Sequence, residues 1–260
     1  MDGSLDRSDL IVITGSGGFI GRALAARLCE RFTVVGLDVV EEKGEHLTQT
    51  VKVDLTSDQD VGDSLARVRA GFGARIASVI HLAAYYDLSG QPNPKYDSIT
   101  VEGTRRLLRG LQKGFEVGQF VFASTLLVHA PSEPGRRIDE NWPLEPKWAY
   151  PASKAKTEEL LRSERGDIPL VFLRMAGVYD ERCRAAFLAQ QIARIYERQP
   201  LGYLFAGDPS RDRPISIWKT LLTPSSGSSS AATACPRSAR SCSGRRRRRA
   251  MKTSSGGSAS

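Results

Sequence analysis

The sequence predicts an α/β fold, with a doubly wound parallel sheet over residues 1–210 and a disordered tail over residues 211–260. Short apolar runs rich in Val and Ile alternate with segments of helical periodicity. This alternation is expected where crossover helices bury parallel strands on both faces. The first run, Ile11–Ile13, leads into a glycine-rich turn and then into a helical segment, Arg22–Arg31. The alternation stops after about Pro209, where Ser, Gly and Arg predominate without an apolar period.

The glycine-rich turn contains Gly15, Gly18 and Gly21, each three residues from the next. Between a strand and a helix, the first glycine permits a tight turn and the second lets the backbone approach a phosphate. The third lets the helix pack closely on the strand. The helix N-terminus adds free N–H groups and the positive end of the helix dipole. The segment therefore predicts a Rossmann fold that binds the pyrophosphate of a dinucleotide.

The remaining elements follow from apolar runs and from helical spacing. Further strands are predicted at Phe32–Leu37, Thr50–Val53, Ala77–Leu82, Gln119–Ser124 and Pro169–Arg174. Further helices are predicted at Ser57–Arg69, Lys95–Gly114, Lys147–Arg162 and Ala185–Glu197. The second of these helices has the most regular pattern, because Leu107, Leu108 and Leu111 share one side.

Asp38 directly follows the second predicted strand, seventeen residues after Gly21. An acid at this place accepts both ribose hydroxyls of an adenosine, and the absence of an Arg immediately after it favours NAD over NADP. The structural alternative is an aspartate that caps the turn at a strand end. Asp54 and Leu55, after the third predicted strand, are expected near the adenine.

The fourth predicted strand ends in His81 and Leu82 and is followed by Ala83 and Ala84. The small alanines would let the chain pass beneath a cofactor. We expect His81 to be a packed residue at the end of a strand and not a catalyst.

Tyr150 and Lys154 are four residues apart, so on a helix they share a face. An ammonium beside a phenol, with a nicotinamide cation nearby, favours the phenolate and lowers the pKa of the tyrosine. Tyr150 could then act as a general base toward a substrate hydroxyl, or as a general acid in the reverse direction. Thr125, at the end of the fifth predicted strand, could bond to the same substrate oxygen.

These motifs together resemble the extended short-chain dehydrogenase/reductase superfamily, in its NAD-dependent epimerase/dehydratase group, over residues 11 to about 210. The resemblance implies hydride exchange between NAD and a carbinol carbon, often of a nucleotide sugar. It assigns catalysis to Tyr150, Lys154 and Thr125. It implies cofactor contacts at Gly15, Gly18, Phe19, Ile20, Gly21, Asp38, Asp54, Leu55, Leu82, Ala83, Ala84 and Lys154. It also implies a possible homodimer through the helices that would hold Lys95–Gly114 and Tyr150–Arg162.

Several positions depart from the family pattern. Thr100 stands where an Asn is usual, and His129-Ala130 replaces a Tyr-Gly pair. Gly177 stands where the family has an Asn that commonly contacts a nucleotide-sugar diphosphate, which disfavours a standard UDP-sugar substrate. Leu126 and Leu127 occupy the places of a dehydratase's further acid/base groups, which disfavours dehydration.

The tail carries all of the excess positive charge. Residues 211–260 hold eleven Lys/Arg and one acid, whereas the first 210 residues have a net charge of −2. The codons from Trp218 onward permit another reading frame that encodes Glu-Asp-Leu-Val-Asp-Ala, close to a segment that family members have here. We therefore expect a frameshift between about Asp208 and Ile215 and a truncated or missing substrate lobe. The alternative function is then an NAD-binding module with little or no catalysis.

The competing interpretation of the tail is a polyanion-binding patch at Arg245–Arg249. It lacks interleaved aromatic residues and a groove-reading element, so no specific nucleic-acid partner is expected. No apolar stretch approaches the roughly 20 residues that span a bilayer, and the N-terminus is polar and acidic. The four cysteines form no CxxC pair. We expect a reduced, cytoplasmic protein with a small-molecule substrate and no membrane partner.

Overall fold

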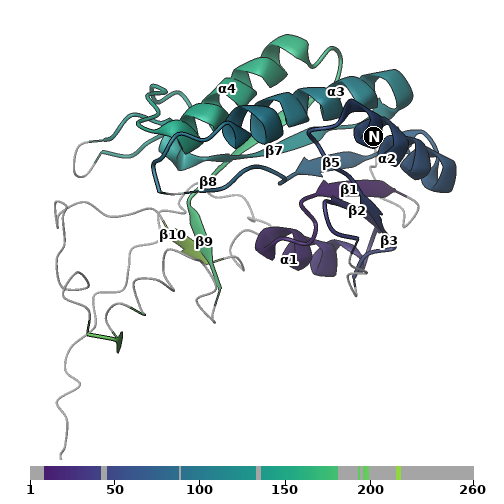
Figure 1. The fold of residues 1–260 in the computed structure, drawn as a ribbon, viewed down its shortest axis with the longest axis horizontal. Coiled ribbons are helices and arrows are strands. Elements are labelled where there is room, and N and C mark those ends of the chain that lie inside the picture. The colour runs from purple at the N-terminus through teal and green to yellow at the C-terminus, as the bar shows by residue number, and fades with distance from the viewer. Residues whose placement is uncertain are drawn as a thin grey trace, which may run out of the picture. The chain divides into compact units, whose positions relative to one another are not determined.

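A computed structural model describes residues 9–41, 46–87, 89–132, 136–180, 193, 196–198 and 215–217. Its central sheet has the strand order β3-β2-β1-β5-β7-β8, and every pairing is parallel (Figure 1). The bounds are β1 Leu10–Thr14, β2 Thr33–Asp38, β3 Gln49–Lys52, β5 Ser78–His81, β7 Phe120–Thr125 and β8 Leu170–Met175. The order runs outward from β1 in both directions, which confirms the doubly wound parallel sheet.

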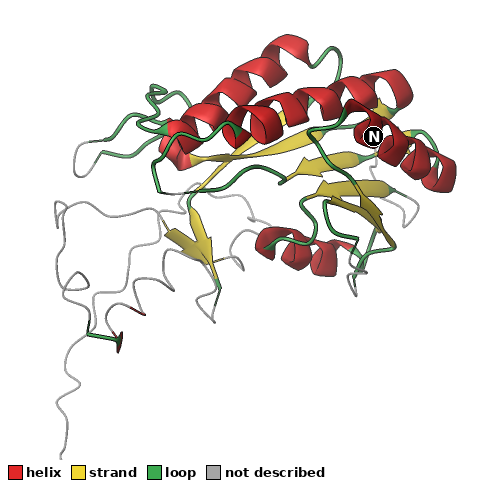
Figure 2. Ribbon diagram, viewed as in Figure 1, coloured by secondary structure: helices red, strands yellow, loops and turns green. Residues whose placement is uncertain are grey.

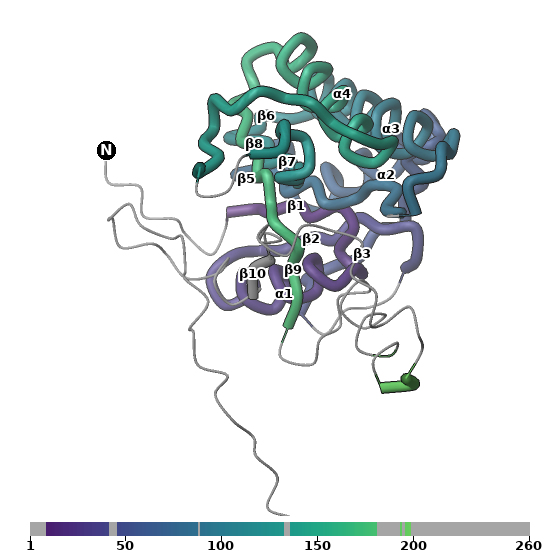
Figure 3. Tube along the Cα trace, turned by 90° about the vertical axis from the view of Figure 1, so that its left-hand side faces the viewer, coloured from purple at the N-terminus to yellow at the C-terminus, as the bar shows by residue number. Residues whose placement is uncertain are grey.

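The helices cover the two faces of the sheet. Helices α2 (Asp58–Phe72), α3 (Glu102–Gly114) and α4 (Ala149–Glu164) lie on one face, and α1 (Phe19–Leu28) lies on the other (Figures 2 and 3). Side chains of β1 alternate between two buried apolar clusters, Val12 with the three helices and Ile13 with α1. The apolar run of β1 is thus buried on both faces, as a central parallel strand requires.

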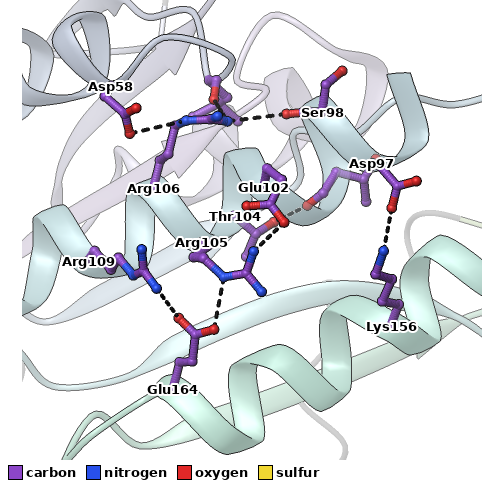
Figure 4. Close-up of polar contacts among 12 residues, drawn as sticks. Asp58, Asp97, Ser98, Glu102, Thr104, Arg105, Arg106, Arg109, Lys156 and Glu164 are labelled. Atoms are coloured by element: carbon purple, nitrogen blue, oxygen red, sulfur yellow. Dashed lines mark hydrogen bonds and ion pairs between the residues drawn. The ribbon is translucent and has the colours of Figure 1, made fainter. Parts of the chain in front are cut away.

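The outward faces of α3 and α4 carry ion pairs within the chain (Figure 4). Arg105 pairs with Glu102 and with Glu164, and Arg109 also pairs with Glu164 at 3.2 Å. Among the described residues, none of the exposed large apolar side chains comes from α3 or α4. The homodimer through these helices therefore stays a prediction.

The observed bounds lie within three residues of the predicted ones, but one element differs in kind. The stretch expected to be a single helix at Lys95–Gly114 begins with a π-helical segment, η1 (Tyr96–Val101), before α3. The spacing of apolar residues does not separate one turn of π-helix from α-helix, so no sequence pattern indicated it. The helix expected at Ala185–Glu197 lies almost wholly outside the described residues.

Two short strand pairs were not predicted. Strands β4 (Arg75–Ile76) and β6 (Glu116–Val117) are parallel and two residues long, too short for a sequence pattern. Strand β9 (Gly177–Tyr179) pairs in parallel with β10 (Ile215–Ile217). The second pair corrects the prediction of disorder at residues 215–217, where the Ile-Ser-Ile alternation is a strand pattern, and the rest of residues 211–260 lies outside the described residues.

The chain divides into the compact units Met1–Thr223 and Pro224–Ser260, and the second lies wholly outside the described residues. Within the part of the chain that the structure describes, no helix combines the length and apolar character needed to cross a membrane.

Candidate active site

The turn between β1 and α1 needs glycines because a Cβ atom at two of its positions would clash with neighbouring backbone. Gly15 has a φ of +68°, and a Cβ there would lie 2.9 Å from the backbone nitrogen of Ala83. A Cβ on Gly21 would overlap the carbonyl oxygen of Gly15. Gly18 is the N-cap of α1, and no side chain caps the helix there. The turn thus leaves a close backbone approach and uncapped N–H groups, which suit an anion such as a pyrophosphate.

Asp38 lies over this turn from the end of β2. Its Oδ2 accepts a 2.8 Å hydrogen bond from the backbone N–H of Gly17. A Cβ on Gly17 would lie 3.3 Å from the same oxygen, so this position also suits glycine. The carboxylate therefore stands beside the predicted pyrophosphate site, where it can accept from ribose hydroxyls.

Asp54 and Leu55 have other partners within the chain. The Asp54 carboxylate accepts from the N–H and the hydroxyl of Thr56, at 2.8 and 2.7 Å, and these bonds lower its pKa. Leu55 is buried in the apolar core against α3. The backbone N–H of Val53 donates to the Asp38 carbonyl at 2.8 Å, which keeps the segment beside Asp38. Their contact with an adenine stays a prediction.

His81 is fully buried and lies in a chain of hydrogen bonds. The Ala83 N–H donates to Thr14 Oγ1 at 3.2 Å, and Thr14 Oγ1 lies 2.6 Å from His81 Nδ1. On its other side, His81 Nε2 lies 2.8 Å from Thr104 Oγ1, which donates to the Thr100 carbonyl at 2.5 Å. These directions assign a neutral ring protonated at Nε2. Burial lowers the pKa of His81 to about 3. Its complete burial and its two hydroxyl partners confirm that it is a packed residue at the end of a strand.

The catalytic candidates come from two elements that pack together. Tyr150 lies in the first turn of α4, and Lys154 lies one turn later and is buried. Lys154 Nζ donates to the Ala123 carbonyl of β7 at 2.7 Å. Thr125 lies at the carboxyl end of β7, and its Oγ1 accepts from the Leu127 N–H at 3.3 Å, which leaves its own proton free to be donated. The helix and the strand thus bring all three residues to one edge of the sheet.

The electrostatics of this pair differ from the expectation. Burial raises the pKa of Tyr150, and the nearby Tyr86 and Tyr96 add to the effect. Burial also lowers the pKa of Lys154 to about 7, against the opposing influence of Glu158. The expected lowering at Tyr150 required a nicotinamide cation as well as Lys154, and in the protein alone burial outweighs it. A phenolate at Tyr150 therefore needs a further cation close by.

Glu158 is a buried charge that the sequence analysis missed. Its side chain is 0% exposed and accepts from the hydroxyl of Ser124 at 2.6 Å. Arg174 donates to both of its oxygens, at 3.1 and 2.7 Å, and Arg162 donates at 2.9 Å. The donors lower the pKa of Glu158 although burial opposes them. This carboxylate ties α4 to the ends of β7 and β8. Its position four residues after Lys154 was the signal that could have revealed it.

A cavity of about 700 Å³ extends from the start of α1 to the end of β8. Its lining includes two of the predicted cofactor contacts, Ile20 and Leu82, together with Leu126 and Met175. The volume is in the range of small-molecule sites. Of the other predicted contacts, Phe19 begins α1 and Ala84 follows β5, and both are half-buried.

The sequence matches the NAD dependent epimerase/dehydratase family over residues 11–213. The chain belongs to this family. The match ends within the window in which the alternative reading frame was expected to begin.

The names of two curated relatives give different substrates and different reactions. An N-acetyl-alpha-D-glucosaminyl-diphospho-ditrans,octacis-undecaprenol 4-epimerase of Escherichia coli O157:H7 is 28% identical, over 72% of this chain and 54% of that protein. A decarboxylating sterol-4-alpha-carboxylate 3-dehydrogenase of Candida albicans is 29% identical, over 65% and 50%. The chain spans about half the length of these curated relatives.

Solved structures agree with the family assignment. The UDP-glucose 4-epimerase of Thermus thermophilus, in complex with NAD, has a TM-score of 0.59 and 29% identity, covering 74% of this chain and 64% of that one. A UDP-glucuronic acid 4-epimerase of Bacillus cereus, at 24% identity and a TM-score of 0.66, covers 82% and 70% and shares the fold.

The residues of this epimerase-family chain fit NAD, the cofactor of the family. The glycine turn leaves room that a Cβ would fill, and α1 begins without a side-chain cap. Asp38 presents a carboxylate beside that turn, and Ile20 and Leu82 line the cavity. These groups would hold the pyrophosphate, the adenosine ribose and the nicotinamide half, in that order.

Proposed function

We propose that this protein is an NAD-dependent oxidoreductase or epimerase that acts at a secondary alcohol carbon, with Tyr150 as its acid/base. The observation that carries the proposal is the placement of Tyr150 and Lys154 on α4 beside the end of β7. Lys154 is bonded to Ala123, two residues before Thr125. The hydroxyls of Tyr150 and Thr125 and the buried amine of Lys154 thus come from a helix and a strand that pack together, which supports assigning them to one site.

When bound, NAD supplies the hydride acceptor. The chain's own residues handle the proton and the orientation. Tyr150 takes the proton of the substrate hydroxyl, and Thr125 donates a hydrogen bond to the same oxygen. Lys154, whose pKa is lowered to about 7, lies one helical turn from Tyr150, and its protonated form would favour the phenolate of Tyr150 together with the nicotinamide cation.

The substrate class that we propose is a sugar-like or other cyclic alcohol. The relatives named for an amino sugar joined to undecaprenol through a diphosphate and for a sterol carboxylate support this breadth. Gly177, in place of the family's Asn, lies at the start of β9 and offers no side chain to a diphosphate. We therefore expect sugars without a nucleotide, or alicyclic alcohols, to be better substrates than UDP-sugars.

Comparing the wild type with Tyr150→Phe tests the function. Turnover is measured over a panel of free sugars, UDP-sugars and hydroxysteroids, as NADH formation for oxidation and as conversion between epimers for epimerisation, and NAD⁺ binding is measured by calorimetry. We expect the variant to lose about 10²- to 10⁴-fold in kcat, because the general base is gone, with little change in the Kd for NAD⁺. The control is Tyr196→Phe, since Tyr196 is 87% exposed. Unchanged turnover in Tyr150→Phe rejects the assignment.

A further inference from the structure

A second tyrosine ring lies against the proposed acid/base. The rings of Tyr86 and Tyr150 pack edge to face, with centroids 5.2 Å apart and planes at 89°. Tyr86 is 56% exposed and Tyr150 is 8% exposed. Tyr86 is therefore the solvent-facing member of the pair and covers one side of the Tyr150 phenol.

The residues on either side of Tyr86 are held by the π-helical segment η1. The Tyr85 N–H donates to Thr100 Oγ1 at 3.0 Å, and the Tyr96 hydroxyl donates to the Asp87 carbonyl at 2.7 Å. Both partners belong to η1. Because the backbone is bonded immediately before and immediately after it, Tyr86 has little freedom to move away from Tyr150.

The side chain of Tyr85 reinforces this arrangement. Its hydroxyl accepts from the side-chain amide of Asn93 at 3.0 Å, and its ring meets that of Tyr96 with centroids 4.9 Å apart. The loop that carries Tyr86 is thus bonded to itself as well as to η1. None of these contacts uses the side chain of Tyr86.

The segment η1 also packs against α4, the helix that carries Tyr150. An ion pair between Asp97 of η1 and Lys156 of α4, at 2.6 Å, joins them at the surface (Figure 4). The segment η1 therefore contacts both the loop that carries Tyr86 and the helix that carries Tyr150. Short π-helical segments occur often at functional sites.

We propose that Tyr86 is a positioning residue for the reaction, whose ring covers the phenol of Tyr150, fixes its orientation and keeps water from it. The inference rests on the proposed function in one respect, because the role matters only if Tyr150 is the acid/base. An edge-to-face pair of this geometry contributes about 0.5–1.5 kcal/mol beyond burial. The raised pKa of Tyr150, whose largest cause is burial, agrees with this cover.

The direct test is O-acetylation of tyrosines by N-acetylimidazole, with the rate at each tyrosine read by peptide mass spectrometry. The proteins are the full-length wild type, Tyr86→Phe and Tyr86→Ala. Tyr196, which is 87% exposed, is the reactive internal reference, and Tyr96, which is 4% exposed, is the protected one. The measurement needs neither cofactor nor substrate.

We expect Tyr86→Ala to raise the acetylation rate of Tyr150 by about 2- to 10-fold, the rate equivalent of losing the ring pair. Tyr86→Phe keeps the ring and should keep the protection. An unchanged rate in Tyr86→Ala overturns the proposal. So does a rise at Tyr150 that is matched at Tyr96, because the cover would then belong to the whole loop.

Turnover separates this inference from the proposed function. With an active alcohol from the panel, Tyr86→Ala should lower kcat while the Kd for NAD⁺ stays unchanged, and Tyr86→Phe should restore kcat. A full loss of protection with unchanged kcat overturns the positioning role. If Tyr150→Phe leaves turnover unchanged, the proposed function fails, whereas the acetylation result still decides whether Tyr86 covers Tyr150.

Discussion

The two ends of the proposed site, which hold the predicted cofactor residues and the proposed catalytic residues, are built by different physical means. At the cofactor end, glycine positions bring backbone against backbone, as where Gly15 approaches Ala83 and Gly21 approaches Gly15. At the catalytic end, buried charged side chains join the elements, as where Lys154 reaches Ala123 and Glu158 joins Ser124 to Arg174. The cofactor end depends on glycines that lack a Cβ atom, and the catalytic end depends on hydrogen bonds and ion pairs of buried charged side chains.

This difference predicts unequal responses to substitution. A missing charge partner leaves another charge buried and unpaired, which is among the largest single-residue effects on stability. An added methyl group in a tight turn is partly relieved by small backbone shifts. The catalytic end should therefore be the more sensitive to change. Three substitutions, from the largest expected effect to the smallest, test that comparison.

Glu158→Ala should lower the free energy of unfolding by about 3–5 kcal/mol, because Arg174, whose side chain is 15% exposed, loses its carboxylate partner and the buried Ser124 hydroxyl loses its acceptor. Urea unfolding followed by circular dichroism measures it. The matched control is Glu159→Ala on the same helix, since the Glu159 side chain is 77% exposed and lies 3.8 Å from Arg162. The control should change stability by less than about 0.5 kcal/mol. Equal losses of unfolding free energy in the two variants would show that the buried ion pairs of Glu158 do not stabilise the fold more than an exposed pair does.

Lys154 should make stability depend on pH. Its pKa is lowered from 10.5 to about 7 in the folded chain, so between these values the unfolded chain binds a proton that the native chain does not. The free energy of unfolding should then rise with pH across this window, by up to about 1.4 kcal/mol per pH unit. Relative to Lys154→Met, the wild type should be least stable at the lower end of the window and recover toward the upper end. Urea unfolding of both proteins at several pH values checks this, and a constant difference would contradict it.

Gly21→Ala should lower stability by about 1–3 kcal/mol and weaken NAD⁺ binding, because the new Cβ overlaps the Gly15 carbonyl oxygen in the turn. The control is Gly62→Ala in α2, where a Cβ meets nothing within 4 Å. There, the higher helix propensity of Ala should add about 0.5–1 kcal/mol. Thermal unfolding and calorimetry with NAD⁺ measure both. A gain of stability in Gly21→Ala, like that expected for Gly62→Ala, would mean that the contact at Gly21 does not matter.

Much of the cofactor end was predictable because its signals are local. The spacing from Gly15 to Gly21, the apolar run before it and Asp38 at a strand end lie within one short stretch of sequence. The structure adds the physical reason for each glycine. It also places Asp38 against Gly17, a contact that spacing could only imply.

At the proposed catalytic end, the sequence predicted that Tyr150 and Lys154 share a helix, which the structure confirms, but it did not predict their pKa shifts. The four-residue spacing placed Tyr150 and Lys154 on one helix face, but the direction of the Tyr150 pKa shift depends on burial. Burial is set by elements far away in the sequence, such as the loop that carries Tyr86. For the same reason, the role of Thr100 in holding that loop had no signal in the local pattern.

By itself, the sequence determined the order of strands and helices, the glycine turn and the residues available for chemistry, because periodicity and spacing are properties of neighbouring positions. The tertiary structure alone decided which charges are buried together and which ring covers Tyr150. Those outcomes depend on desolvation and on contacts between distant segments. The pairing of Glu158 with Arg174 and the packing of Tyr86 on Tyr150 arise when helix, strand and loop meet at one edge of the sheet.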